Sequence, residues 1–504
     1  MPRELKSLNF IPGIKRDGTA LEGAMWSGGE WVRFYRGLPK KMGGYYMVTS
    51  EFSDVIREVY VRPRQDLNRV FCFTKNGIEC VNLDKLGYGN GRYDRTPAGF
   101  AVSDDNTWTV DALYDAGGSA TNIVIAHASQ ALTNIDDATN LPIYYGDVNA
   151  ATAFTALGKS VSGGIAVVHP YLFFYGNDGY IGWSAVNSPT ELTSGDAGEA
   201  NISSTKVCRI LPTRGTGQSP SALVWSLDAF GRLSWVGGGA VFRHDPISSQ
   251  TSLLSQRCVV EYDNQFFWIG VDRFNVYSGS LQELPNTVNS EWFFDNLNWT
   301  HRNKVWGTKI PRWGEIWWHF PKGDSTECNH AIIFNVREKT WYDVAINRSA
   351  GAFAQMLPVP LWADSVIDPV SNKFSLWGHE RGRDIIIRDD VLALRSSIET
   401  PNFGLPTGGL GSDESQGVDA WTRIDRIEPD FKQVGSMTVE VLGRDYANAA
   451  DRTSNPYVFS EGDGKVDIRE QQRHIRLRFT SNATGGNYHL GKSLIHIEKG
   501  DERQ

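Results

Sequence analysis

The side chains with the clearest potential for metal chemistry lie between residues 319 and 330. His319, Asp324, Glu327, Cys328 and His330 carry the imidazole, thiol and carboxyl groups that bind zinc and other transition metals. However, Cys328-x-His330 beside one distant histidine matches no standard zinc spacing, and the segment lies where a hairpin turn is expected between two strands. The sequence therefore predicts a solvated hairpin tip, with no metal and no cofactor.

A second candidate is the Gly-Lys-Ser sequence at 158–160, which resembles the end of a phosphate-binding loop. That loop requires an earlier glycine at the position that Ala153 occupies here. No strand-to-helix transition surrounds the sequence either. We therefore expect no nucleotide site.

Two turns, at Asp178 and Asp228, resemble the Asp-box turn of glycosidase propellers. Neither has the spacing of that turn, because Asp178 directly precedes Gly179, whereas Asp228 precedes Gly231 by three positions and Trp235 by seven. A sialidase would also need an arginine triad and a Tyr/Glu pair. No catalytic residue is predicted from these turns.

Near the C-terminus, basic side chains alternate with apolar ones in a pattern typical of a strand with one buried face. Ile475, Leu477 and Phe479 share one face, and His474 lies on the other. The arginines form a basic stripe that could contact DNA or an acidic partner, or could form a polar sheet face paired with Asp467 and Glu470. Both interpretations stay open. The interface candidates are Arg469, Arg473, Arg476 and Arg478.

The overall charge argues against a protein that binds nucleic acid tightly. The 504 residues include 50 basic and 58 acidic side chains, a formal net charge of −8, which opposes binding driven by phosphate neutralisation. The N-terminus lacks the apolar core of a signal peptide, and no apolar run approaches the ~18 residues of a membrane span. Five scattered cysteines predict a reduced protein made in a cytoplasm.

Short aromatic-rich strands with Gly, Asp and Asn turns recur along the chain and predict an all-β fold. The most informative stretch, 312–343, reads as three strands, and similar units lie at 172–184, 223–244 and 265–279. In 70–83, an Asn76-Gly77 turn would place Cys80 opposite Phe73 and direct Cys72 to the other face, so that no disulfide forms. The spacing of the strands predicts a β-propeller of six or seven blades.

Composition divides the chain into four parts. Residues 1–50 are predicted to form an extended N-terminal arm that adds a strand to another element, and 51–395 the β-propeller. Residues 396–417 concentrate Gly, Pro, Ser and acidic residues and are predicted to be a linker. Residues 418–504, with alternating strands at 437–443, 465–470, 473–479 and 492–498, are predicted to form a small antiparallel β domain.

Three segments resemble those of one protein family. WVRFYRGLPKKMGGY near the start, FNVREKTWYDVAINRSA at 334–350 and REQQRHIRLRFTSNATGGNYHLGKSLIHIEKGD at 469–501 are similar to tail nozzle proteins of short-tailed bacteriophages, also called tail tube protein B, head-completion or stabilisation proteins. The similarity follows the order of elements through nearly the whole chain. It is weakest over 100–165.

The resemblance implies a homo-hexameric ring in the virion tail that docks below the dodecameric adaptor under the portal. Such a ring continues the DNA channel, carries tail fibres or spikes, helps to retain the genome and reaches the host envelope indirectly. The family has no catalytic residues. The acidic charge suits a lumen through which duplex DNA passes without specific binding.

Two other functions stay open on the sequence. A receptor-binding or depolymerase tail protein would show a trimeric β-helix pattern or a carboxylate pair in a cleft. A β-propeller glycosidase would need an acid and a nucleophile separated by ~5–9 Å. The oligomeric state separates these functions, because a ring of six favours the nozzle, a trimer the fibre and a monomer the enzyme.

Overall fold

Strands dominate the structure, a computed structural model that describes residues 4–19, 22, 24–62, 68–83, 89–100, 106–118, 120–129, 139–213, 219–238, 241–355, 357–403, 421–446 and 449–500. Within these residues the only helices are α1 (Ser290–Asn296) and the 3-10 helix η1 (Trp299–Lys304). Neither has the length and apolar character of a membrane-crossing helix. The expected all-β class is confirmed.

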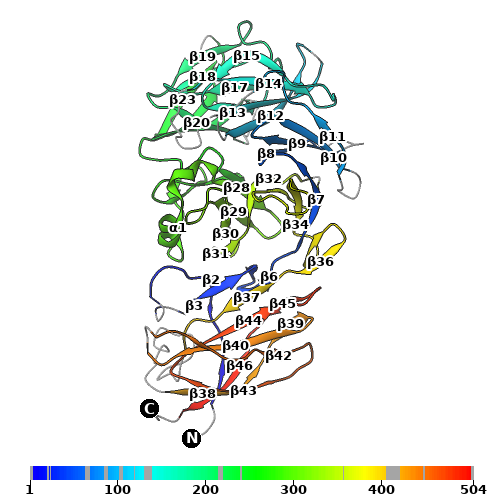
Figure 1. The fold of residues 1–504 in the computed structure, drawn as a ribbon. Coiled ribbons are helices and arrows are strands. Elements are labelled where there is room, and N and C mark those ends of the chain that lie inside the picture. Colours follow the sequence, from blue (N-terminus) through cyan, green and yellow to red (C-terminus); the bar gives the residue numbers. More distant parts are fainter. Residues whose placement is uncertain are drawn as a thin grey trace.

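Between residues 56 and 345, the described chain forms six successive four-stranded antiparallel sheets, each in chain order from one edge to the other (Figure 1). The first three contain β8 (Ile56–Arg62), β9 (Asn68–Thr74), β10 (Ile78–Leu83) and β11 (Gly89–Asp94); β12 (Thr107–Asp115), β13 (Thr121–Ser129), β14 (Leu141–Asp147) and β15 (Thr155–Val161); and β16 (Gly164–Val168), β17 (Tyr171–Tyr175), β18 (Tyr180–Trp183) and β19 (Gly198–Asn201). The next three contain β20 (Val207–Pro212), β21 (Ser221–Ser226), β22 (Phe230–Trp235) and β23 (Phe242–Ser248); β24 (Val260–Tyr262), β25 (Gln265–Ile269), β26 (Phe274–Tyr277) and β27 (Leu281–Glu283); and β28 (Trp306–Ile310), β29 (Glu315–Phe320), β30 (His330–Asn335) and β31 (Thr340–Ala345).

A seventh sheet joins the two ends of this series. β32 (Arg348–Ala352), β33 (Leu361–Asp364) and β34 (Phe374–His379) pair in order, and β7 (Tyr45–Phe52), which precedes the first sheet in the sequence, adds beside β34. The first strand of the seventh sheet contacts β8, and β8 contacts β12. The succession of sheets therefore returns on itself, closed by a strand from the N-terminal side.

The hairpin of β9 and β10 forms with a different register from the one predicted. Cys80 lies opposite Phe71 rather than Phe73, because the Thr74 N–H donates to the Gly77 carbonyl, which places the two-residue turn at Lys75 and Asn76 instead of Asn76 and Gly77. Cys72 and Cys80 still lie on opposite faces, in different apolar clusters. All five cysteines are buried and free.

The N-terminal arm pairs within its own chain at every strand described. β1 (Glu4–Ser7) pairs with β46, β4 (Gly28–Glu30) with β37, and the hairpin β5–β6 (Val32–Tyr35, Leu38–Lys41) adds to β45. β2 (Ile11–Ile14) and β3 (Met25–Trp26) pair with each other in parallel. The arm does add strands to other elements, and those elements belong to its own chain; β1, β4 and β5 each stand at the edge of a sheet.

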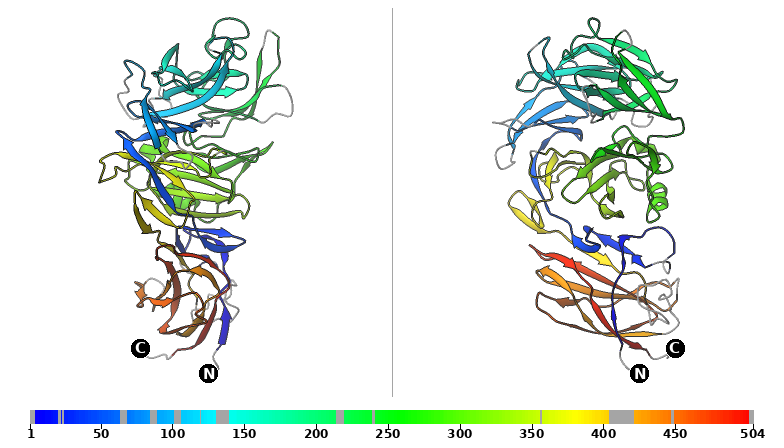
Figure 2. Two further views of the ribbon diagram at one scale, coloured as in Figure 1. Left: turned by 90° about the vertical axis from the view of Figure 1, so that its right-hand side faces the viewer. Right: turned by 180° about the vertical axis from the view of Figure 1, so that it is seen from behind.

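The C-terminal strands form three sheets together with the arm (Figure 2). The strands are β37 (Ser396–Glu399), β38 (Thr422–Glu428), β39 (Phe431–Val434), β40 (Met437–Arg444), β41 (Arg452–Thr453), β42 (Tyr457–Phe459), β43 (Val466–Gln472), β44 (His474–Ser481), β45 (Asn487–Leu490) and β46 (Leu494–Lys499). The linker predicted over 396–417 begins too early, because residues 396–399 are strand β37, paired with β4 and β44. Residues 404–417 lie outside the described residues.

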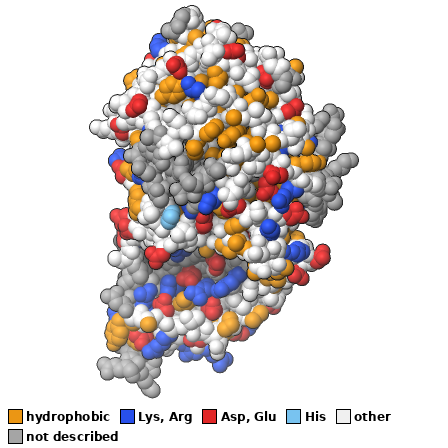
Figure 3. Space-filling view, turned by 45° about the horizontal axis from the view of Figure 1, so that its top comes forward, with side chains coloured by type: hydrophobic (Ala, Val, Ile, Leu, Met, Phe, Trp, Pro, Cys, Tyr) orange, Lys and Arg blue, Asp and Glu red, His pale blue; other side chains and the backbone are white. Residues whose placement is uncertain are grey.

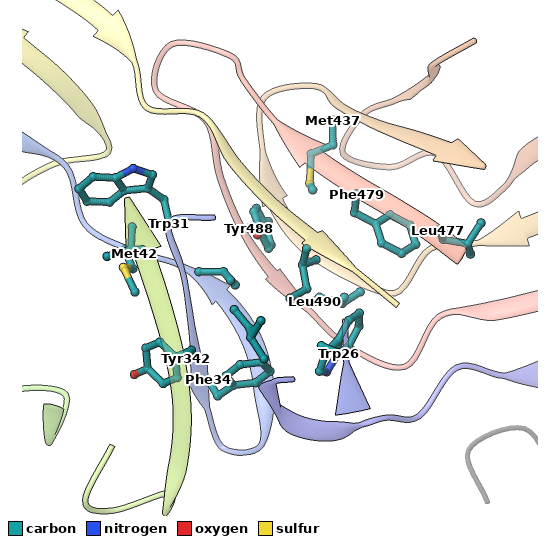
Figure 4. Close-up of a cluster of buried hydrophobic side chains, with 14 of the residues drawn as sticks. Trp26, Trp31, Phe34, Met42, Tyr342, Met437, Leu477, Phe479, Tyr488 and Leu490 are labelled. Carbon is teal, nitrogen blue, oxygen red and sulfur yellow. The ribbon is translucent and has the colours of Figure 1, made fainter. Parts of the chain in front are cut away.

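One apolar core connects the arm, the sixth sheet and the C-terminal strands. Phe34 of the arm packs against Tyr342 of β31 at 5.7 Å between ring centroids. Tyr488 and Phe479 of the C-terminal strands belong to the same buried cluster (Figure 4). The C-terminal strands therefore share sheets with strands from the N-terminal arm, and one continuous core joins them to the sixth sheet across the predicted boundary between 395 and 418.

Candidate assembly interface

The four predicted interface arginines do not form one stripe. Arg469 is exposed on β43, in the sheet β1-β46-β38-β43, whereas Arg476 and Arg478 lie on β44, in the sheet that contains β37 and β40. Arg473 is half-buried at the bend between β43 and β44. The alternation along one strand indicated the faces correctly, but it could not show that the chain changes sheet between β43 and β44.

Acidic neighbours neutralise the two arginines of β44. Glu399 of β37 accepts from Arg478 Nε at 2.6 Å and from Arg476 Nη1 at 3.2 Å. Arg476 also pairs with Asp451, and Arg478 Nη1 lies 3.6 Å from Glu440. Burial acts to lower the pKa of Arg478, but Glu399 outweighs it and raises that pKa.

The partner acids named from the sequence are wrong. Asp467 pairs with Arg426 at 2.8 Å, and Glu470 accepts from the Tyr457 hydroxyl. Figure 3 shows Lys and Arg side chains along a hollow on the lower part of this face, with acidic side chains among them. Such a mixed surface suits protein contacts better than it suits a polyanion.

A buried ionic cluster fixes the joint between the arm and the sixth sheet. Arg33 of β5 donates from both terminal nitrogens to Glu380 at 2.7 Å, and its Nε lies 2.8 Å from Glu315 of β29. The indoles of Trp313 and Trp317 donate to these carboxylates at 2.9 Å. Carboxylates hydrogen-bonded on several sides in this way are held in one geometry.

The charges in this cluster shift one another's protonation. Burial opposes ionisation of Arg33, but Glu315 and Glu380 outweigh it and raise the Arg33 pKa. Burial raises the pKa of Glu315, whereas Arg33 overcomes burial at Glu380 and lowers its pKa. Because Glu315 and Glu380 are buried and share one guanidinium, they are not arranged as the acid and nucleophile of a glycosidase.

The candidate metal ligands do not converge on one point. The His319 ring stacks on Trp306 with 4.2 Å between centroids, and His330 Nε2 lies 2.9 Å from Asp343 Oδ2. Glu327 accepts from Arg57 at 2.6 Å. In the described part of the chain, no group of three or more His, Cys, Asp or Glu is placed to hold a metal ion.

The predicted solvated hairpin tip is correct only in part. Asp324 is exposed, but His319 and Cys328 are fully buried and His330 nearly so. The reason is that β29 and β30 are central strands, each buried on both faces along its whole length. His319 therefore belongs to an aromatic layer rather than to a surface loop.

The remaining sequence candidates lie in ordinary strands and turns. Lys159 is in β15, where its ammonium lies 5.1 Å from the Tyr180 ring and 3.5 Å from Glu199. Asp178 and Gly179 both have positive φ, as a tight turn between β17 and β18 requires. Asp228 occupies the corresponding turn between β21 and β22.

The sequence did not predict a groove beside the seventh sheet, which we call the waist groove. It has a volume of about 360 Å³ and is lined by Trp31, Tyr45, Met47, Ala345, Ile346, Asn347, Arg348, Asp364, Val366, Ile367, Asp368, Pro369, Trp377, Ile385, Ile387 and Leu392. The hairpin of β35 (Asp384–Ile387) and β36 (Asp390–Ala393) forms one wall, and β35 pairs in parallel with β7. The apolar residues at 385–387 and 391–392, on either side of a charged turn, are the signal that could have indicated it.

Exposed apolar side chains gather around this groove. The exposed fraction is 50% for Val366, 45% for Ile367, 50% for Val391 and 49% for Leu392. Soluble proteins rarely expose adjacent apolar residues in this way except at sites of interaction. The waist groove with the β35–β36 hairpin is therefore a stronger interface candidate than the arginines of β44.

Comparison with known proteins identifies no relative. No family model matches the chain, and no curated protein sequence matches it.

Proposed function

We propose that this protein is a structural subunit of a short bacteriophage tail, the nozzle that docks below the portal and adaptor and continues the DNA channel. We interpret the fold as a seven-bladed β-propeller, in which each of the six four-stranded sheets is one blade and β32, β33, β34 and β7 form the seventh. A short C-terminal β domain is attached to it through the arm.

One observation carries the proposal: the three segments that resemble the nozzle family meet in space. The arm segment 31–45 contains the hairpin of β5 and β6, in which β6 pairs with β45 of the segment 469–501. Phe34 packs on Tyr342 of the segment 334–350, and Tyr35 lies 6.0 Å from His489 between ring centroids. Segments separated by hundreds of residues thus form one joint, which is consistent with a common structural role.

The character of this joint suits a part that bears load. Arg33, Glu315 and Glu380 tie the arm to the sixth sheet and to the turn after β34, and such buried charge-assisted contacts hold the joined elements in one arrangement. A conduit for DNA under pressure needs such rigidity. An enzyme would instead need an open cleft with carboxylates free to react.

In the virion, the subunits are expected to form a six-fold ring at the tail. The measurement is electron microscopy of the purified protein and of the virion that contains it. A six-fold ring at the tail tip agrees with the nozzle, a three-fold density would indicate the receptor-binding tail protein, and a monomer absent from the virion would favour the glycosidase.

Free protein is expected to show no detectable binding to duplex DNA at physiological salt. Each chain carries a net charge of −8, and Arg476 and Arg478 are already paired with acidic side chains. Non-specific DNA-binding proteins still show dissociation constants of ~10⁻⁴–10⁻⁶ M under these conditions. Filter binding or fluorescence anisotropy across a salt series tests this. Micromolar binding whose affinity falls steeply with salt would mean that basic side chains in the lumen bind the DNA backbone.

A further inference from the structure

The β35–β36 hairpin ends the seventh sheet with an open strand edge. In the described residues the strand order is β32-β33-β34-β7-β35-β36, so β36 has a neighbour on one side only. The hairpin projects from the side of the molecule at the level of the waist, as two opposite views agree (Figure 1, Figure 2). Open edges are normally shielded by charge, proline or a covering element, because they pair readily with other strands.

The pairing of the hairpin shows which backbone groups face outward. Ile387 pairs with Asp390 across the two-residue turn, and Ile386 pairs with Val391. In an antiparallel hairpin the pair that flanks a two-residue turn is hydrogen-bonded, and the next pair is not. The N–H and C=O of Val391 therefore point away from β35, toward the open edge.

The apolar side chains make this edge attractive to a partner. Ile386 and Val391, which lie opposite each other, are exposed by 36% and 50%, and Leu392 on the groove side is exposed by 49%. Of the large apolar side chains exposed in the described residues, six come from the stretch 366–392. The exposed charges near this edge are Arg388, Asp389 and Asp390 at the turn and Arg395 just after β36, and none lies at Val391 or Leu392.

The sequence of β36 is compatible with pairing to itself. In an antiparallel pair centred on Val391, that residue exchanges both hydrogen bonds with Val391 of the other copy. Asp390 then lies opposite Leu392, so that no two carboxylates of β36 face each other, and Asp389 lies in the turn just before the paired residues. Exposed Arg395 of each copy comes diagonally within reach of Asp389 of the other, which adds two favourable charge contacts.

We propose that the free chain forms a two-fold dimer in which β36 of one copy pairs with β36 of a second copy. This contact extends each six-stranded sheet across the dimer and covers Val391 and Leu392. It goes beyond the proposed function, because a two-fold contact cannot generate a six-fold ring. The contact is small, so the dimer is weak. We expect it to form as the protein concentration rises from about 1 µM to about 1 mM.

Sedimentation of the full chain from about 1 µM to about 1 mM tests the proposal. Wild type is expected to pass from monomer to dimer over this range. Val391→Pro removes the outward N–H without touching the bonds to β35, and is expected to weaken the dimer by at least about tenfold. Val391→Thr is the matched control, because it keeps the N–H and a β-branched side chain, and it is expected to dimerise.

A charge exchange provides a second, independent test, in case the proline disturbs the hairpin. Asp389→Arg and Arg395→Asp are each expected to weaken the dimer, and the double variant to restore it. A wild-type chain that stays monomeric up to about 1 mM overturns the proposal, as does a Val391→Pro chain that folds normally and dimerises as tightly as wild type. Failure of the double variant to recover excludes this register. The proposed function is tested separately, by whether the Val391→Pro chain still forms a six-fold ring, because the ring does not use the β36 contact.

Discussion

Replacing Arg33 by methionine is expected to lower the unfolding free energy by about 3–5 kcal/mol, because it leaves two buried carboxylates without their cation. Arg33 and Glu315 are fully buried, and Glu380 is nearly so. Methionine has a similar length and fills the space, so the loss comes from charge rather than from a cavity. Urea-induced unfolding, followed by tryptophan fluorescence, measures it.

The control for this change is Arg36→Met, three residues along the same hairpin, where the arginine is exposed. That substitution is expected to alter stability by no more than about 0.5 kcal/mol. The triple variant Arg33→Met/Glu315→Gln/Glu380→Gln removes the charges together and should recover part of the loss. If Arg33→Met costs less than about 1 kcal/mol, the cluster does not hold the arm to the sixth sheet.

The second large effect is a loss of stability as the pH falls from about 6.5 toward 4. Burial lowers the pKa of His127 to about 4, and it lowers the pKa values of His319 and His379 well below that of a free histidine. A depressed pKa in the folded state means that the unfolded state binds protons first. The stability is therefore complete above pH 6.5 and is lost progressively until the folded-state pKa is reached.

His127 alone accounts for a loss of about 3 kcal/mol across this window, from the difference between its two pKa values. Urea unfolding at a series of pH values between 7.5 and 4.5 measures the total slope. A stability that stays constant through this range would show that the buried histidines accept protons without unfolding, contrary to the prediction.

The substitution His319→Phe isolates the contribution of one buried histidine to the pH dependence of stability. The ring packs between Trp306 and Trp362, and among the described residues neither of its nitrogens has a hydrogen-bond partner. Phenylalanine keeps the stacking, so the variant is expected to be at least as stable as wild type at pH 7.5 and to show a shallower loss toward pH 4.5. His169→Gln, at an exposed histidine, is the control that should leave the slope unchanged.

The sequence by itself determined the local structure of this protein. Alternating and continuous apolar runs are properties of neighbouring residues, so the strands at 312–343 and 473–479 could be read directly, with Ile475, Leu477 and Phe479 correctly assigned to the buried face. The separation of Cys72 and Cys80 on two faces followed for the same reason, even though the predicted register was displaced.

Only the tertiary structure decided which distant segments pair. The closing position of β7, the use of the arm inside its own chain and the sharing of Arg33 between Glu315 and Glu380 all depend on contacts across hundreds of residues. No local pattern encodes them, because a strand's alternation is equally satisfied by any partner of matching polarity. The same reason explains why Arg476 and Arg478 were recognised as a polar face but assigned the wrong acidic partners, and why the position of Val391 on a sheet edge became visible only in the folded chain.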